Sequence, residues 1–124
     1  MKLPRLLKLQ LLYYLAGMIF NTISFLLINK AGTPLTPNDP IMGCIAMTIY
    51  ALFLIPGFLH KIKIYRFLMI VAVFLLGYGG VINHFNMINE SPELYHSVTA
   101  GVIGVMINIF GLTLNILAAI GKFK

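Results

Sequence analysis

Charge is the scarcest property of this sequence. Of its 124 residues only nine are Lys or Arg and three are Asp or Glu, so charged residues make up 10% of the chain. Ordinary soluble domains carry roughly 25% charged residues, whereas this chain has a mean hydropathy of +0.94. The composition therefore excludes an ordinary soluble domain and indicates an integral membrane protein.

Charges are also missing from the middle of every long apolar run. Ionisable side chains held inside a membrane usually mark ion or proton pathways. Antiporters of the small multidrug-resistance kind also have four short helices, but they need a carboxylate in the first one, where this chain has Gly17 and Asn21. The chain does not resemble that family, and its residues indicate no other.

The chain has a single cysteine, Cys44, and no tryptophan. One cysteine excludes an intramolecular disulfide, and within an apolar run it is best interpreted as a small packing residue. No serine or threonine belongs to a recognisable nucleophile–base arrangement, and no glycine-rich phosphate loop follows a strand. We therefore do not expect an enzyme.

Long apolar runs are what the sequence has in abundance. Four of them cover residues about 9–29, 41–59, 64–83 and 97–120, and a run of about 20 residues crosses a hydrocarbon core of roughly 30 Å. The basic start resembles a secretory signal, but its apolar run is too long, so we expect an uncleaved first span. The sequence predicts one all-α domain, residues 1–124, in which four transmembrane helices form an antiparallel up-down bundle.

Proline marks the ends of the second run. Residues 30–40 contain a glycine and three prolines, which predict a loop. Asn38 or Asp39 is placed to cap the second helix, with Pro40 at its first position. Pro56 removes a backbone donor near the other end and predicts a kink or an early helix end.

Glycine is concentrated near the end of the third run, at positions 77, 79 and 80. This cluster weakens helix propensity and predicts close helix packing or a bend. Residues 84–96 are predicted to form the second loop at that side of the membrane. Ser91 is predicted to cap the fourth helix, with Pro92 at its first position.

The basic residues are unevenly distributed among the predicted ends and loops. Lys30 alone falls on one side of the membrane, and the other eight fall on the opposite side: Lys2, Arg5, Lys8, Lys61, Lys63, Arg66, Lys122 and Lys124. Because cytoplasmic segments carry an excess of Lys and Arg, both termini are expected to be cytoplasmic. We expect a bacterial inner membrane, with a mitochondrial membrane as the alternative, and anionic lipid headgroups as partners instead of nucleic acid.

Small and polar residues form a stripe on two of the predicted helices. The C-terminal stripe, with spacings of three and four, is Gly101, Gly104, Asn108, Gly111 and Asn115. The N-terminal stripe has similar spacings and is Gln10, Tyr14, Gly17, Asn21 and Ser24. Such spacings place residues on one helical face, where small residues admit a neighbouring backbone and amides hydrogen-bond across the contact. Both stripes are predicted helix-packing interfaces, while Val105 and Ile109 are predicted to face lipid.

These stripes favour a function in assembly. We expect a small accessory or structural subunit that packs against other integral membrane subunits through its stripes. The alternative is a small transporter, channel or lipid-flipping protein that acts as a homo-oligomer, with its asparagines facing a shared lumen. Native purification distinguishes the two, because it yields either unrelated partners or copies of one chain.

The strongest candidate for a metal or haem site consists of His84, Glu93 and His96. Glu93 and His96 are three residues apart and would share a face of the fourth helix, with His84 across the loop. Two imidazoles and a carboxylate can bind zinc or iron, and two histidines can ligate a haem. Histidines and carboxylates are also common at a membrane surface, so we expect no cofactor and unliganded histidines.

Overall fold

The computed structural model describes residues 1–124 and contains helices and no strands. In chain order these are α1 (Leu3–Ala31), α2 (Pro40–Phe58), α3 (Ile62–Leu76), the π-helical η1 (Gly77–Ile82), α4 (Asn83–Glu90), the short 3-10 helix η2 (Pro92–Leu94) and α5 (Val98–Ala119). Because α3, η1 and α4 follow one another without a break, the chain has four long rods, each apolar enough to cross a membrane. The predicted all-α bundle of four membrane-spanning helices is confirmed.

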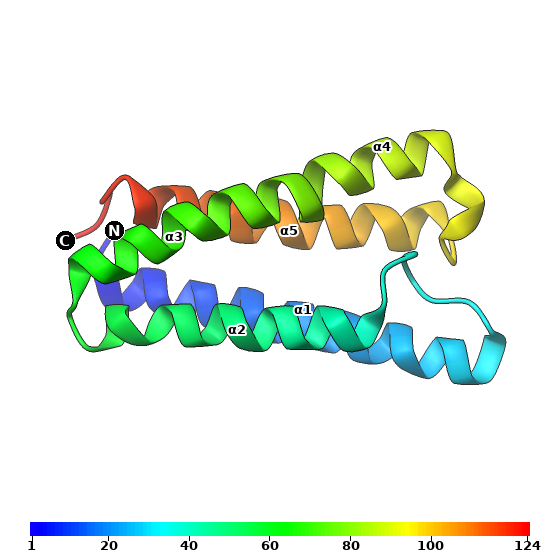
Figure 1. The fold of residues 1–124 in the computed structure, drawn as a ribbon, viewed down its shortest axis with the longest axis horizontal. Coiled ribbons are helices and arrows are strands. Elements are labelled where there is room, and N and C mark those ends of the chain that lie inside the picture. The colour runs from blue at the N-terminus through cyan, green and yellow to red at the C-terminus, as the bar shows by residue number, and fades with distance from the viewer.

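The four rods run antiparallel, and both termini lie at one end of the bundle (Figure 1). α1 packs against α2 and α5, and α3 packs against the same two helices. We call the end with both termini the terminal end, and the end with the 32–39 and 91–97 connections the loop end. At the terminal end, Leu3 N donates to Lys124 O and Lys124 N donates to Met1 O, each at 2.9 Å.

Two rods are longer than the apolar runs that predicted them. α1 begins at Leu3 instead of about residue 9, and the third rod continues through α4 to Glu90 instead of ending near residue 83. Apolar residues mark only the part of a helix that lies in hydrocarbon. The polar extensions, such as Asn83 to Glu90, retain helical backbone bonds beyond that region.

The structure confirms one predicted helix cap and corrects another. The Asp39 carboxylate accepts from Ile41 N at 2.9 Å, with Pro40 as the first residue of α2. Ser91 instead precedes η2 and makes no side-chain cap. The cap of α5 is Ser97, whose hydroxyl oxygen accepts from the backbone N–H three residues later at 3.0 Å. After η2 the backbone becomes extended at Tyr95, so a new cap is needed before α5 begins.

Pro56 lies inside α2, which ends two residues later at Phe58. The carbonyl oxygen of Pro56 then accepts from Lys61 N at 2.8 Å in the turn before α3. Because Pro56 has no backbone N–H, the last part of α2 lacks one helical hydrogen bond, and the turn follows this point.

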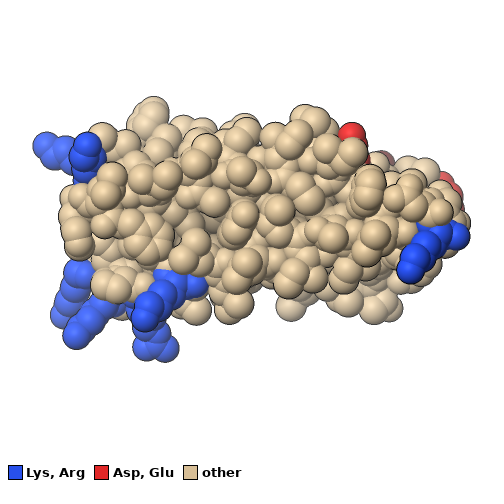
Figure 2. Space-filling view, turned by 90° about the horizontal axis from the view of Figure 1, so that it is seen from below, with Lys and Arg blue, Asp and Glu red and all other residues tan.

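The outer surface of the rods is apolar, and the charges lie at the two ends. Phe74 is 74% exposed, Leu75 66% and Phe67 64%, as expected for side chains that face lipid tails. Figure 2 shows Lys and Arg side chains clustered at one end of an otherwise uncharged surface, with acidic side chains and another basic group at the opposite end. This separation matches a protein whose middle lies in hydrocarbon.

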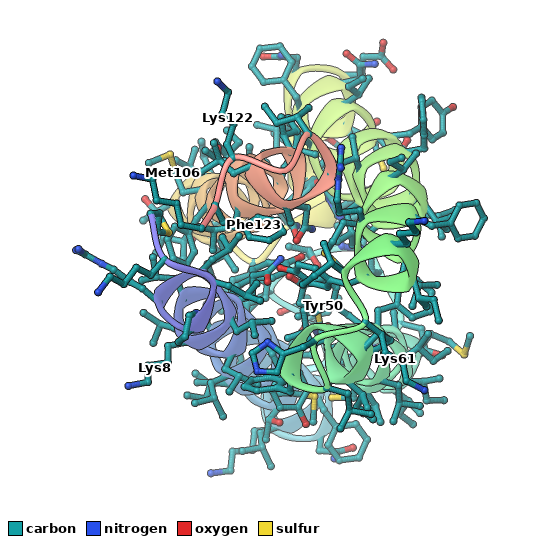
Figure 3. The ribbon with its side chains drawn as sticks, turned by 90° about the vertical axis from the view of Figure 1, so that its left-hand side faces the viewer. Lys8, Tyr50, Lys61, Met106, Lys122 and Phe123 are labelled. Atoms are coloured by element: carbon teal, nitrogen blue, oxygen red, sulfur yellow. The ribbon has the colours of Figure 1, made fainter.

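The buried hydrophobic core lies mainly in the half of the bundle near the terminal end. Leu6, Tyr13, Tyr65 and Met69 are fully buried there, and Phe123 covers Tyr65 with a ring-centroid distance of 6.0 Å. Viewed from the terminal end, Tyr50 lies between the helices while lysine side chains point outward (Figure 3). The other half encloses a polar space.

Candidate polar site inside the bundle

The C-terminal stripe packs against other helices and loops of the same chain. An added Cβ at Gly111 would lie 2.5 Å from atoms of the Tyr13 ring, and one at Gly104 would lie 3.1 Å from Phe20 Cζ. At Gly101 the neighbours are Tyr95 and a side chain of α4. Four members of the stripe are buried: Gly101, Gly104, Gly111 and Asn115.

The N-terminal stripe is also used within the chain. Gly17 lies against Met47 of α2, and the amide of Asn21 occupies the space above Gly43 while donating to Gly17 O at 2.8 Å. The buried Ser24 hydroxyl accepts from the backbone N–H of residue 35 at 2.9 Å and ties the first loop to α1. Both stripes therefore contribute contacts inside one bundle.

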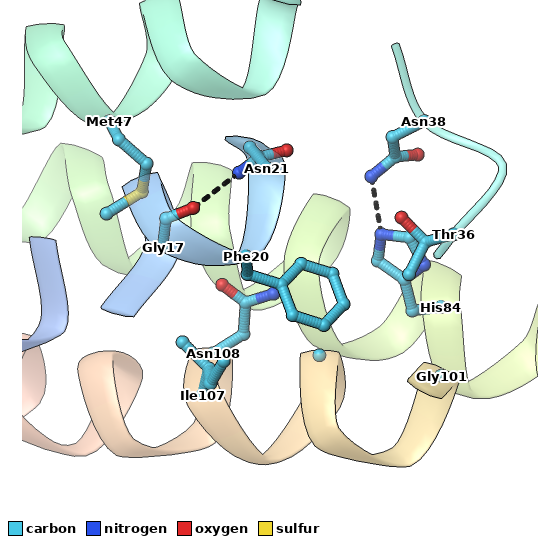
Figure 4. Close-up of a pocket in the computed structure, with 11 residues that line it drawn as sticks. Gly17, Phe20, Asn21, Thr36, Asn38, Met47, His84, Gly101, Ile107 and Asn108 are labelled. Carbon is cyan, nitrogen blue, oxygen red and sulfur yellow. Dashed lines mark hydrogen bonds between the residues drawn. The ribbon is translucent and has the colours of Figure 1, made fainter. Parts of the chain in front are cut away.

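A small polar cavity lies near the loop end, between both stripes (Figure 4). Its volume is about 60 Å³, roughly the liquid volume of two water molecules. Eleven residues line it: Gly17, Phe20, Asn21, Thr36, Asn38, Met47, His84, Gly101, Gly104, Ile107 and Asn108. Only Phe20, Met47 and Ile107 are hydrophobic, and none carries a permanent charge. The lining is therefore polar and uncharged.

Thr36 is the member of this lining best suited to receive a ligand. The residue is 7% exposed and lines the cavity, and its hydroxyl makes no hydrogen bond within the chain. By contrast, the Asn21 amide already donates to a backbone carbonyl. A hydroxyl that lines the cavity and has no partner in the chain can bond water or a ligand there.

His84 closes the loop end of the cavity by joining three segments. Asn38 Nδ2 lies 2.6 Å from His84 Nε2, and His84 Nδ1 lies 2.9 Å from the Tyr95 hydroxyl. An amide N–H can only donate, so Nε2 accepts and the neutral ring carries its proton on Nδ1, which donates to Tyr95. The Tyr95 hydroxyl in turn donates its proton to the backbone carbonyl oxygen of His84 at 3.4 Å. Burial raises the pKa of Tyr95, which favours the protonated hydroxyl that this bond requires.

The structure does not assemble the predicted metal or haem candidates. Glu93 lies in η2, which ends at Leu94, so it shares no helical face with His96. The ring of His96 lies at the surface, 3.4 Å from the Thr33 hydroxyl, whereas His84 points into the bundle. The shared-face prediction is wrong because Tyr95 is extended where the sequence pattern predicted continuous helix.

A second polar cluster lies toward the terminal end and was not predicted as a site. Gln10 Nε2 and the Tyr50 hydroxyl both donate to Asn115 Oδ1, at 3.0 and 2.6 Å. The Tyr65 hydroxyl donates to Gln10 Oε1, and Gln10 Nε2 also contacts the sulfur of Met69 at 3.2 Å. We call Gln10, Tyr50, Tyr65 and Asn115 the amide–tyrosine network. Its sequence signal was one glutamine, one asparagine and two tyrosines within otherwise apolar runs.

Tyr13 and Asn108 lie between this network and the cavity. The Tyr13 hydroxyl donates to Asn108 Oδ1 at 3.0 Å, and Asn108 Nδ2 donates to Gly80 O at 3.2 Å. The Tyr13 ring packs edge-on against Tyr50 with centroids 5.1 Å apart. Polar side chains therefore follow the bundle axis from the loop end to the terminal end.

No protein-family model, curated protein or solved structure matches this chain.

Proposed function

We propose that this chain is a small integral membrane protein that binds a small uncharged polar solute in the cavity and conducts it along the bundle axis. The observation that supports this function is the cavity itself: amide, hydroxyl and imidazole groups line a space inside a bundle with an apolar exterior. Binding sites of transporters commonly lie between membrane helices, where such polar groups recognise the solute.

The lining favours an uncharged solute of a few non-hydrogen atoms. A charge taken from water into this space would have no opposite charge beside it, and such burial costs several kcal/mol. Amides, hydroxyls and a neutral imidazole offer both donors and acceptors, which suits a small amide or alcohol. The volume of about 60 Å³ is far below the roughly 300 Å³ of a site for drug-sized molecules.

The orientation that we propose places the loop end outside the cell. Cytoplasmic segments are enriched in Lys and Arg, and eight of the nine basic residues belong to the segments of the terminal end. With both termini cytoplasmic in a bacterial inner membrane, the cavity would receive its solute from the external side.

An accessory-subunit role is the second proposal, and it would use other surfaces than the two stripes. Gly79 of η1 supports it, because nothing lies within 4 Å of an added Cβ there and the neighbouring Tyr78 is 70% exposed. A partner helix could approach closely at this glycine. Stoichiometric recovery of an unrelated membrane protein, lost in a Gly79→Leu variant, would favour this role over solute conduction.

The test of the first proposal is urea flux into proteoliposomes, followed by light scattering after a urea gradient is imposed. We expect faster re-swelling than in protein-free vesicles, and a rate lowered about fivefold by Thr36→Val, which removes one cavity hydroxyl without changing side-chain shape. Thr113→Val makes the same chemical change on the exposed side of α5 and should keep the rate. Equal rates with and without protein would overturn the proposal.

A further inference from the structure

Asn115 carries an unpartnered donor in the core of the bundle. The residue is fully buried, and its Nδ2 is the only buried side-chain nitrogen or oxygen atom without a hydrogen-bond partner. An unpaired buried amide nitrogen costs free energy that a bound acceptor would recover. This atom therefore points to a ligand.

The amide orientations described here pair more polar groups than the rotated ones do. With the Asn115 amide turned over, its nitrogen would face the nitrogen of Gln10, and two donors would meet. If Gln10 turned as well, the Asn115 nitrogen would donate to the Gln10 oxygen, but the Asn115 oxygen would lose both of its donors. The hydroxyl protons of Tyr50 and Tyr65 would then each face a nitrogen instead of an oxygen. The described arrangement satisfies the most groups, and it leaves Nδ2 of Asn115 free.

Tyr13 separates this free donor from the cavity. Asn108 and Asn115 are seven residues apart on α5, which is about 10 Å along a helix, and Gly111 lies between them. The Tyr13 ring sits directly on Gly111, where a Cβ would lie 2.5 Å from three of its ring atoms. Its hydroxyl is held by Asn108 on the cavity side.

We propose that Asn115 Nδ2 is a second binding position for the solute, and that Tyr13 is the side chain that the solute must pass to reach it. This inference rests on the proposed function and adds the route. The ligand chemistry is a carbonyl or hydroxyl oxygen, which accepts from the Asn115 amide. Once the Tyr13 ring leaves Gly111, the cavity and the amide–tyrosine network form one polar passage.

The passage continues toward the terminal end through Gln10 and Tyr65. The hydroxyl of Tyr65 is bonded to Gln10, and its ring meets Phe123 at the end of the bundle. Each step along this route offers a donor or an acceptor that is uncharged. A small amide such as urea can therefore exchange one neutral hydrogen-bond partner for the next.

The test combines urea flux with NMR of ¹⁵N-labelled protein in nanodiscs, in which the side-chain amide signals of Asn108 and Asn115 are followed during a urea titration. Tyr13→Phe keeps the ring on Gly111 but removes its bond to Asn108. We expect it to raise the urea flux about fivefold, the factor that one hydrogen bond represents, and to let urea shift the Asn115 signal at lower concentration. Tyr14→Phe, one residue away and without a hydroxyl bond inside the chain, is the matched control and should change neither.

The outcomes separate the two proposals. If urea shifts the Asn108 signal but never the Asn115 signal, and Tyr13→Phe leaves flux unchanged or lower, the second position is refuted while the cavity remains a binding site. If neither signal moves and no flux is seen, the proposed function itself is refuted. A shift at Asn115 with raised flux in Tyr13→Phe supports both.

Discussion

Gly111 is a position at which helix packing requires a residue without a side chain. Replacing it with alanine places a Cβ against the Tyr13 ring, which must move. Overpacking of this kind typically costs about 1 to 3 kcal/mol, so the free energy of unfolding in mixed micelles should fall by that amount for Gly111→Ala. The measurement is a denaturing-detergent titration followed by circular dichroism.

Gly79→Ala is the internal comparison for that substitution. Nothing lies within 4 Å of an added Cβ at this exposed position, and alanine favours helical structure by roughly 0.5 to 1 kcal/mol over glycine. It should leave the unfolding free energy unchanged or raise it. Equal losses at both glycines would mean that the contact with Tyr13 does not determine the effect.

The sequence pattern predicted which small residues lie at helix contacts better than it predicted their partners. Spacing alone cannot distinguish a neighbouring helix of the same chain from another protein, and it named Tyr14 where Tyr13 is the buried ring. It also predicted that Val105 and Ile109 face lipid. Ile109 is 42% exposed, but Val105 is buried at 9%, because α5 contacts helices on two sides.

Among the helices, α5 offers a direct test of the corrected cap. Ser97 accepts from Ala100 N, whereas Ser91 makes no side-chain cap bond. Ser97→Ala should lower the free energy of unfolding by about 0.5 to 2 kcal/mol, measured by the same detergent titration. Ser91→Ala should lower the free energy of unfolding by less. The reverse order of losses would support Ser91, the cap predicted from the sequence.

The limits of prediction for the helices follow from what an apolar run reports. It reports the segment immersed in hydrocarbon, which explains why the spans were found and their polar extensions were not. The candidate site was harder to foresee, because Gln10 and Tyr50 belong to different helices and meet only at Asn115. Single-helix periodicity carries no information about such meetings across the bundle.

The whole molecule makes a prediction about its orientation in the membrane. With Cys44 replaced by serine, a cysteine at Thr33 of the loop end should react with a membrane-impermeant maleimide added to intact cells. A cysteine at Lys63 of the terminal end should react only after the membrane is opened. Both positions are exposed in the structure, and labelling in the opposite order would place the termini outside.

The π-helical segment η1 also determines the rotation of everything beyond it. The backbone N–H of Asn83 donates to Tyr78 O, five residues back instead of four, so the third rod contains one residue more than an α-helix of the same course. One residue corresponds to about 100° about a helix axis. His84 faces Asn38 because of that surplus residue. The contact between the two side chains therefore depends on the number of residues in the rod before His84 as much as on the histidine itself.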